Sequence, residues 1–61
     1  MAQITEKELG LLKDRLTDEE NLVAKYRLYA SMTSDQEMKN YFNETADMHK
    51  RHFDALFANL R

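Results

Sequence analysis

The 61-residue chain contains no cysteine, no proline and no tryptophan, and Gly10 is its single glycine. Without cysteine it forms neither a disulfide framework nor a thiolate zinc site, and nothing points to an oxidising compartment. The shortage of proline and glycine, with 43% hydrophobic residues, argues against both disorder and a turn-rich β fold. Such a small helical chain needs other support, which leaves oligomerisation or a metal held by histidine and carboxylate side chains.

Long apolar runs and an excess of positive charge are also missing. No apolar run approaches the roughly 18 residues of a membrane-spanning helix, and the opening residues Met1–Ile4 do not resemble a signal peptide. A net charge of −2, with 33% charged residues of both signs, gives no electrostatic footprint for nucleic acid. We therefore expect a single domain over residues 1–61, with no membrane segment and no nucleic-acid partner.

Two passages carry a helix-start signal, in which a hydroxyl residue is followed three positions later by a glutamate. Thr5 precedes Glu8 in this way, and Ser34 precedes Glu37. After each, a stripe of mainly apolar residues recurs at alternating steps of three and four, the heptad spacing of helices that pack along one seam. The stripes comprise Leu9, Leu12, Leu16, Glu19, Val23, Tyr26, Ala30 and Thr33, and then Met38, Phe42, Ala46, His49, Phe53, Leu56 and Leu60.

This spacing predicts an all-α fold with helices at about residues 6–33 and 36–60, joined around Ser34. A connection of two or three residues makes the helices pack antiparallel, as a helical hairpin. A lone hairpin has a seam but no enclosed core, and it cannot bury the six aromatic residues of the chain. We therefore predict a homodimer in which two hairpins complete a four-helix bundle.

Two ionisable residues, Glu19 and His49, interrupt the stripes. Each lies about 22–23 Å from the turn at 1.5 Å per residue, so the two side chains should face each other across the seam. Each is also near the middle of its helix, so both copies of the pair should converge in an antiparallel, two-fold dimer. His52 is three residues beyond His49, which puts a second imidazole on the same helical face.

A charged residue in a seam is unfavourable unless it is paired or binds a metal ion. One interpretation is a hydrogen-bonded pair of Glu19 and His49 that fixes the register of the helices. The other is a metal site formed by Glu19, His49 and His52. No nucleophile set and no glycine-rich phosphate loop can be assembled from the remaining residues, so we expect no catalytic residues and no enzymatic activity.

The sequence resembles the ferritin-like superfamily in two places. Tyr26 follows Glu19 by seven residues and Ala30 follows by four more, and His49-Lys50-Arg51-His52 lies where rubrerythrin-type proteins carry Glu-x-x-His. Nearly the whole chain is similar to the small spore-coat proteins related to coat protein F of endospore-forming Firmicutes. The similar segments are Thr5-Glu6-Lys7-Glu8-Leu9, Lys25-Tyr26 with Tyr29-Ala30, and the closing His49-x-x-His52.

The resemblance implies a half-size ferritin-like unit that dimerises and acts as a structural or interaction protein in sporulation or spore-coat assembly. Other spore-coat proteins would be its partners, in the mother-cell cytoplasm or the spore coat. Glu19 and His52 match metal-ligand positions, and Tyr26 would bond a carboxylate ligand. His49 stands where the motif has a bridging glutamate. A dimer with two glutamates and four histidines therefore suits one Zn²⁺, Ni²⁺ or Cu²⁺ ion better than an oxo-bridged iron pair.

Two alternative functions are compatible with the sequence. The first is a metal-binding bundle with a Glu19/His49/His52 site, for storage, sensing or residual redox chemistry, in which iron is also a candidate. The second is an RNA-binding helical-hairpin dimer, similar in length and architecture to a plasmid copy-number regulator. RNA binding needs a basic stripe along one bundle face, whereas the lysines and arginines here are scattered among acids.

Overall fold

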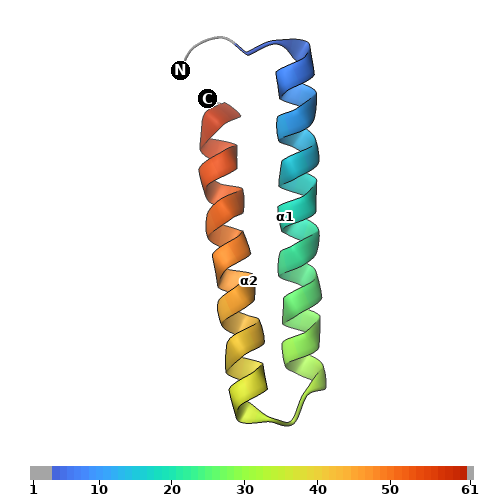
Figure 1. Cartoon of the computed structure of the whole chain (residues 1–61), viewed down its shortest axis with the longest axis vertical. Helices are drawn as coiled ribbons and strands as arrows, with labels where there is room; N and C mark the ends of the chain where they lie inside the picture. The colour runs from blue at the N-terminus through green and yellow to red at the C-terminus, as the bar shows by residue number, and fades with distance from the viewer. Residues whose placement is uncertain (1–3, 61) are drawn as a thin grey trace.

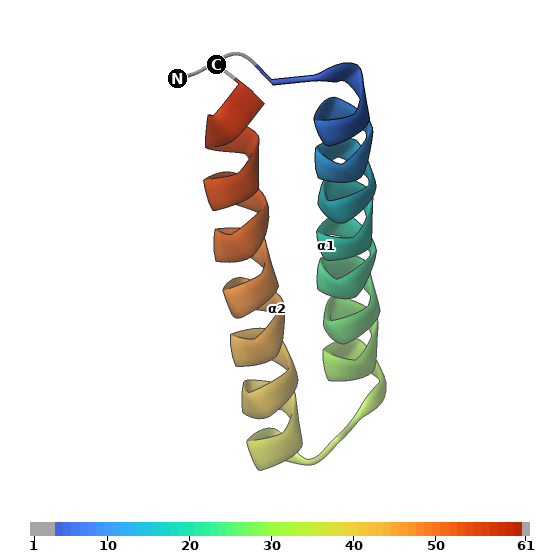
Figure 2. The ribbon, with the colours of Figure 1, turned by 45° about the horizontal axis from the view of Figure 1, so that its top comes forward.

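A computed structural model describes residues 4–60 of the chain. Helix α1 (Glu6–Met32) and helix α2 (Gln36–Phe57) are followed by a short 3₁₀ helix, η1 (Ala58–Leu60). The two long helices lie side by side and antiparallel, joined by a tight turn (Figures 1 and 2). The predicted all-α helical hairpin is therefore confirmed. Residues 1–3 and 61, which the predicted domain includes, lie outside the described part.

Helix α1 begins with the predicted capping box. The Thr5 hydroxyl accepts a hydrogen bond from the backbone N–H of Glu8 at 3.1 Å, and the Glu8 carboxylate accepts one from the backbone N–H of Thr5 at 3.0 Å. The helix ends at Met32, one residue earlier than predicted, because Thr33 is extended with φ −98° and ψ 143°. The hydroxyl of Thr33 accepts a bond from the backbone N–H of Asp35 at 3.1 Å, which stabilises the turn.

The start of α2 corrects the second predicted capping box. The N-cap is Asp35 and not Ser34, and its carboxylate accepts a hydrogen bond from the backbone N–H of Met38 at 3.1 Å. Aspartate is as good an N-cap as serine, and its charge also suits the positive end of the helix dipole. At the other end, α2 tightens into a 3₁₀ turn after Phe57 and does not continue as an α-helix to residue 60, as is common where the last carbonyls lack helical partners.

The hairpin encloses a thin core. Within residues 4–60, the buried side chains are Leu16, Glu19, Ala30 and Ala46. Aromatic rings pack near the turn, where Tyr26, Tyr29 and Phe42 lie with their centroids 5.5–6.1 Å apart. Nine large apolar side chains are exposed: Leu11, Leu28, Tyr29, Met32, Met38, Tyr41, Met48, Phe57 and Leu60. No helix among the described residues is long and apolar enough to cross a membrane.

Candidate metal centre

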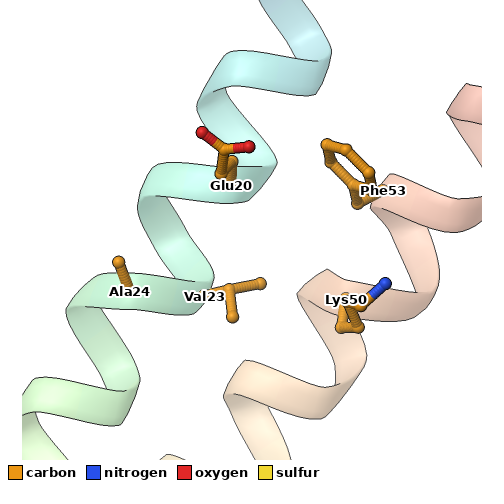
Figure 3. Close-up of a pocket in the computed structure, with 5 residues that line it drawn as sticks. All are labelled: Glu20, Val23, Ala24, Lys50 and Phe53. Carbon is orange, nitrogen blue, oxygen red and sulfur yellow. The ribbon is translucent and has the colours of Figure 1, made fainter.

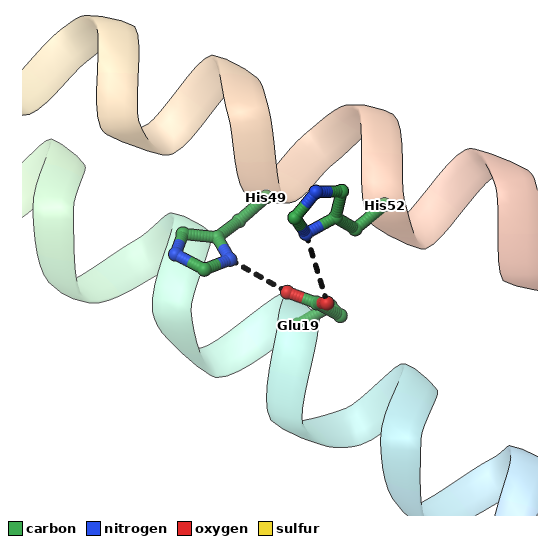
Figure 4. Close-up of side chains that lie close together, drawn as sticks. All are labelled: Glu19, His49 and His52. Carbon is green, nitrogen blue, oxygen red and sulfur yellow. Dashed lines mark hydrogen bonds and ion pairs between the residues drawn. The ribbon is translucent and has the colours of Figure 1, made fainter.

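Glu19 is the one charged side chain that is buried within the described residues, with 1% of its surface exposed. It lies in the middle of α1. The helix runs through this segment without interruption, as the periodicity predicted. His49 and His52 project from successive turns of α2 toward its carboxylate (Figure 4). The structure thus brings together the three predicted ligand residues in a single chain.

Both carboxylate oxygens of Glu19 are engaged. Oε1 accepts a hydrogen bond from Nδ1 of His49 at 2.6 Å. Oε2 accepts one from Nη2 of Arg15 at 3.0 Å and lies 3.3 Å from Nδ1 of His52. An ionised carboxylate can only accept, so Nδ1 of His49 carries the proton in this arrangement. No buried side-chain polar atom in the described part lacks a partner, which is how a thin core tolerates a buried charge.

The pKa of the Glu19 carboxyl reflects opposing influences. Burial raises this pKa because it removes water from the charged form. The hydrogen bond with His49 lowers it, as do the positive charges of that imidazole, of His52 and of Arg15. The lowering influences prevail, so the pKa lies below its ordinary value and Glu19 is an anion at neutral pH. A buried anion of this kind attracts protonated imidazoles or a metal cation.

Aromatic contacts hold the imidazoles in place. The ring of Tyr26 lies parallel to the ring of His49, with the centroids 5.9 Å apart and the planes inclined by 6°. His52 meets His49 edge to face, at a centroid distance of 5.5 Å. The resemblance implies a bond from the Tyr26 hydroxyl to a carboxylate ligand; the contact that the structure shows is between its ring and that of His49. Stacking of this kind orients the imidazole toward Glu19.

The three side chains could hold a metal cation. One ligand atom from each of Glu19, His49 and His52 can be chosen so that all three lie within 4.8 Å of one another. Zinc binds nitrogen and oxygen ligands at about 2.0–2.2 Å, which puts neighbouring ligand atoms of a tetrahedral site about 3.3 Å apart. A cation would therefore replace the proton between Glu19 and His49 and widen their 2.6 Å contact. Glu19 is the single carboxylate among these three ligand residues.

Arg15 is a part of the cluster that our sequence reasoning missed. Its position four residues before Glu19 is the spacing at which oppositely charged side chains meet on a helix, so the signal was present in the sequence. Arg27 was also missed. It crosses to α2, where it binds Asp47 at 2.6 Å and Asn43 at 3.1 Å. Asp47 is therefore engaged by Arg27 and is not one of the three ligand residues.

No protein-family model, curated protein or solved structure matches the chain. The likeness to ferritin-like and coat F-like proteins therefore stays a prediction from the sequence.

Proposed function

We propose that the chain is a non-enzymatic structural protein that works as a homodimeric four-helix bundle. The observation that carries this proposal is the imbalance between the core and the surface of the hairpin. Three apolar side chains are buried within residues 4–60, whereas nine large apolar ones are exposed. Exposed apolar surface on this scale favours association, and a second hairpin is the partner that is always present at the same concentration.

The resemblance to coat F-like proteins extends the proposal to sporulation or spore-coat assembly, with other coat proteins as partners. We do not extend it to RNA, because Arg15, Arg27 and Lys50 are each paired with a carboxylate. An expression and fractionation experiment in a sporulating host tests the cellular role. We expect a tagged copy to be recovered with the coat of mature spores, and its even distribution in vegetative cells would contradict this role.

Analytical ultracentrifugation of the purified chain tests the dimer. We expect a mass of about 14.6 kDa, twice the 7.3 kDa of one chain, with a dissociation into monomers on dilution. Circular dichroism at the same concentrations follows helix content and shows whether the chain is folded. A folded, helical species that stays at 7.3 kDa at every concentration would contradict the proposal.

Metal binding at Glu19, His49 and His52 is a second candidate function. It is favoured by the convergence of two imidazoles and one carboxylate on a space that a cation could fill. Metal analysis of untagged protein and thermal melts with added Zn²⁺, Ni²⁺, Cu²⁺ or Fe²⁺ test it. We expect the melting temperature to rise with at least one of these ions and Glu19→Gln to abolish the rise. Less than about 0.1 equivalent of metal per dimer, with unchanged melting, would contradict it.

A further inference from the structure

The seam between α1 and α2 has two flanks, and each contains an open groove. Figure 3 shows the groove on one flank, which is lined by Glu20, Val23, Ala24, Lys50 and Phe53. We call this side the Lys50 flank. The groove on the opposite side, which we call the His52 flank, is lined by Arg15, Glu19, His52, Ala55 and Leu56. The two flanks differ in the side chains that the single hairpin leaves exposed on them.

The Lys50 flank carries charged contacts beside its groove, and these are matched within one chain. Arg27 bridges the two helices by binding the Asp47 carboxylate at 2.6 Å and the Asn43 side chain at 3.1 Å. One turn further along α2, Lys50 binds Asp54 at 2.6 Å. These side chains are about half exposed and their charges are already matched. These matched charges suit the flank to water beside its groove.

The His52 flank carries unpaired apolar side chains on α2. Tyr41 and Met48 lie eleven and four residues before His52, spacings that put all three on one face of the helix. Ala55, three residues after His52, continues the row and lines the same groove. Tyr41 is 63% exposed and Met48 is 37% exposed in the single hairpin. Within the described chain this row stays partly open to solvent.

A matching row runs along α1. Leu11, Leu22 and Tyr29 lie four residues before and seven and fourteen residues after Arg15, so they share its face of the helix. Arg15 lines the same groove as His52, which places both rows on the His52 flank. Leu11 and Tyr29 are exposed. The flank therefore presents two parallel rows of apolar side chains with the Glu19 cluster between them.

We infer that a second copy of the hairpin packs on the His52 flank and that the Lys50 flank faces water in the dimer. This inference rests on the proposed homodimer and assigns its interface. The single hairpin exposes 4805 Å². Two separate hairpins expose about 9,600 Å², whereas a compact protein of their combined mass exposes about 6,900 Å². The difference of about 2,700 Å² lies within the range of obligate homodimer interfaces.

The assignment places the buried carboxylate at the dimer interface. The side chains of Arg15 and His52 are 57% and 50% exposed in the single hairpin, and both would be covered by the partner. Both contact the Oε2 atom of Glu19. The polar cluster would then restrict how the two copies align, because a shifted partner would leave these charges facing apolar side chains.

Two exposed alanines provide a matched test. Ala55 lines the groove of the His52 flank, and Ala24 lines the groove of the Lys50 flank. We expect Ala55→Arg to raise the dimer dissociation constant at least a hundredfold, measured by sedimentation equilibrium. Ala24→Arg should change it less than threefold. Circular dichroism confirms that each variant keeps its helices.

Thiol labelling gives a second measurement that does not depend on disrupting the dimer. The natural chain has no cysteine, so Ala55→Cys and Ala24→Cys each introduce a single reactive group. We expect labelling at position 55 to slow at least tenfold between dilute, monomeric protein and concentrated, dimeric protein. Labelling at position 24 should be independent of concentration.

The outcomes separate this inference from the proposed dimer. A wild-type chain that is monomeric and folded at every concentration overturns both. A wild-type dimer that survives Ala55→Arg, or that protects position 24 and leaves position 55 reactive, overturns the interface alone. A dimer that Ala55→Arg dissociates and Ala24→Arg preserves supports both.

Discussion

Glu19 and His49, thirty residues apart in the sequence, are joined by a 2.6 Å hydrogen bond across the middle of the hairpin. The bond sets the register of the two helices. A slip of one helical turn would move α2 by about 5.4 Å and, in one direction, leave the buried carboxylate opposite Ala46, which cannot form a hydrogen bond with it. A seam of leucines would oppose such a slip less strongly, because one apolar neighbour can replace another.

Substitution of His49 tests this contact. His49→Ala should lower the free energy of unfolding by about 2 kcal/mol, because a buried carboxylate loses its nearest donor. Urea denaturation followed by circular dichroism measures the change. The control is Asp54→Ala, which breaks the exposed Lys50–Asp54 pair and should change stability by less than about 0.5 kcal/mol. Equal effects of the two substitutions would show that the buried contact has no special role.

Acid should destabilise the hairpin through Glu19. The pKa of Glu19 is lowered in the folded state, so the ionised carboxylate stabilises the fold above the ordinary carboxyl pKa. This stabilisation is lost as the pH falls through the lowered folded-state pKa. Melting temperatures of chelator-treated protein between about pH 7 and pH 3 measure the trend. We expect a steeper acid decline for the natural chain than for Glu19→Gln, and superimposable profiles would refute the assignment.

The turn offers a test of the observed cap. Asp35→Ala should reduce the free energy of unfolding by about 1 kcal/mol, because the backbone N–H of Met38 loses its acceptor. Ser34→Ala should have an effect below about 0.3 kcal/mol, since Ser34 does not cap α2 in the structure. Chemical denaturation of both variants compares them directly. A larger loss with Ser34→Ala would restore the capping box that the sequence suggested.

Heptad spacing was sufficient to predict the helices and the meeting of Glu19 with His49. Both depend on quantities that are fixed for any α-helix, namely its period and its rise per residue. The cap of α2 is not decided by residue type, because Ser34 and Asp35 are adjacent and both are good caps. Only the backbone dihedral angles around the turn decide between them, and those depend on how the two helices dock.

The charged contacts also differ in whether the sequence is enough to predict them. The pairing of Arg15 with Glu19 is local and could have been read from their four-residue spacing. The contact of Arg27 with Asp47 spans twenty residues and depends on how each helix is rotated about its own axis. The apolar faces are wide, so the sequence defines that rotation only to within several tens of degrees. Neither Arg27 nor Asp47 could therefore be identified as a contact between the helices.

Gly10 offers a route to greater stability. It lies inside α1, its φ is not positive, and a Cβ atom built on it would meet nothing within 4 Å. Gly10→Ala should therefore raise the free energy of unfolding by about 0.5–1 kcal/mol, because alanine restricts the unfolded chain without crowding the folded one. Thermal and urea denaturation measure the gain. A loss of stability would mean that another surface, such as a partner, packs closely against this position.

Arg15 should oppose metal binding at the cluster. It shares the Oε2 atom of Glu19 with His52, so a cation must displace the guanidinium or accept its repulsion. Arg15→Gln should tighten Zn²⁺ binding about five- to tenfold, which corresponds to about 1 kcal/mol of relieved charge repulsion. Calorimetric titration of metal-free protein measures the affinity.

The matched control for this effect is Arg27→Gln, which removes the same charge from the Asp47 contact, away from the cluster. It should leave the Zn²⁺ affinity within about twofold of the natural value, because Arg27 is eight residues, about 12 Å, from Glu19 along α1 and its exposed charge is screened over that distance. Arg15→Lys keeps the charge but loses the planar donor pair, and its affinity should lie between those of Arg15→Gln and the natural chain. Weaker Zn²⁺ binding by Arg15→Gln would instead mean that Arg15 holds the carboxylate in the orientation that the metal requires.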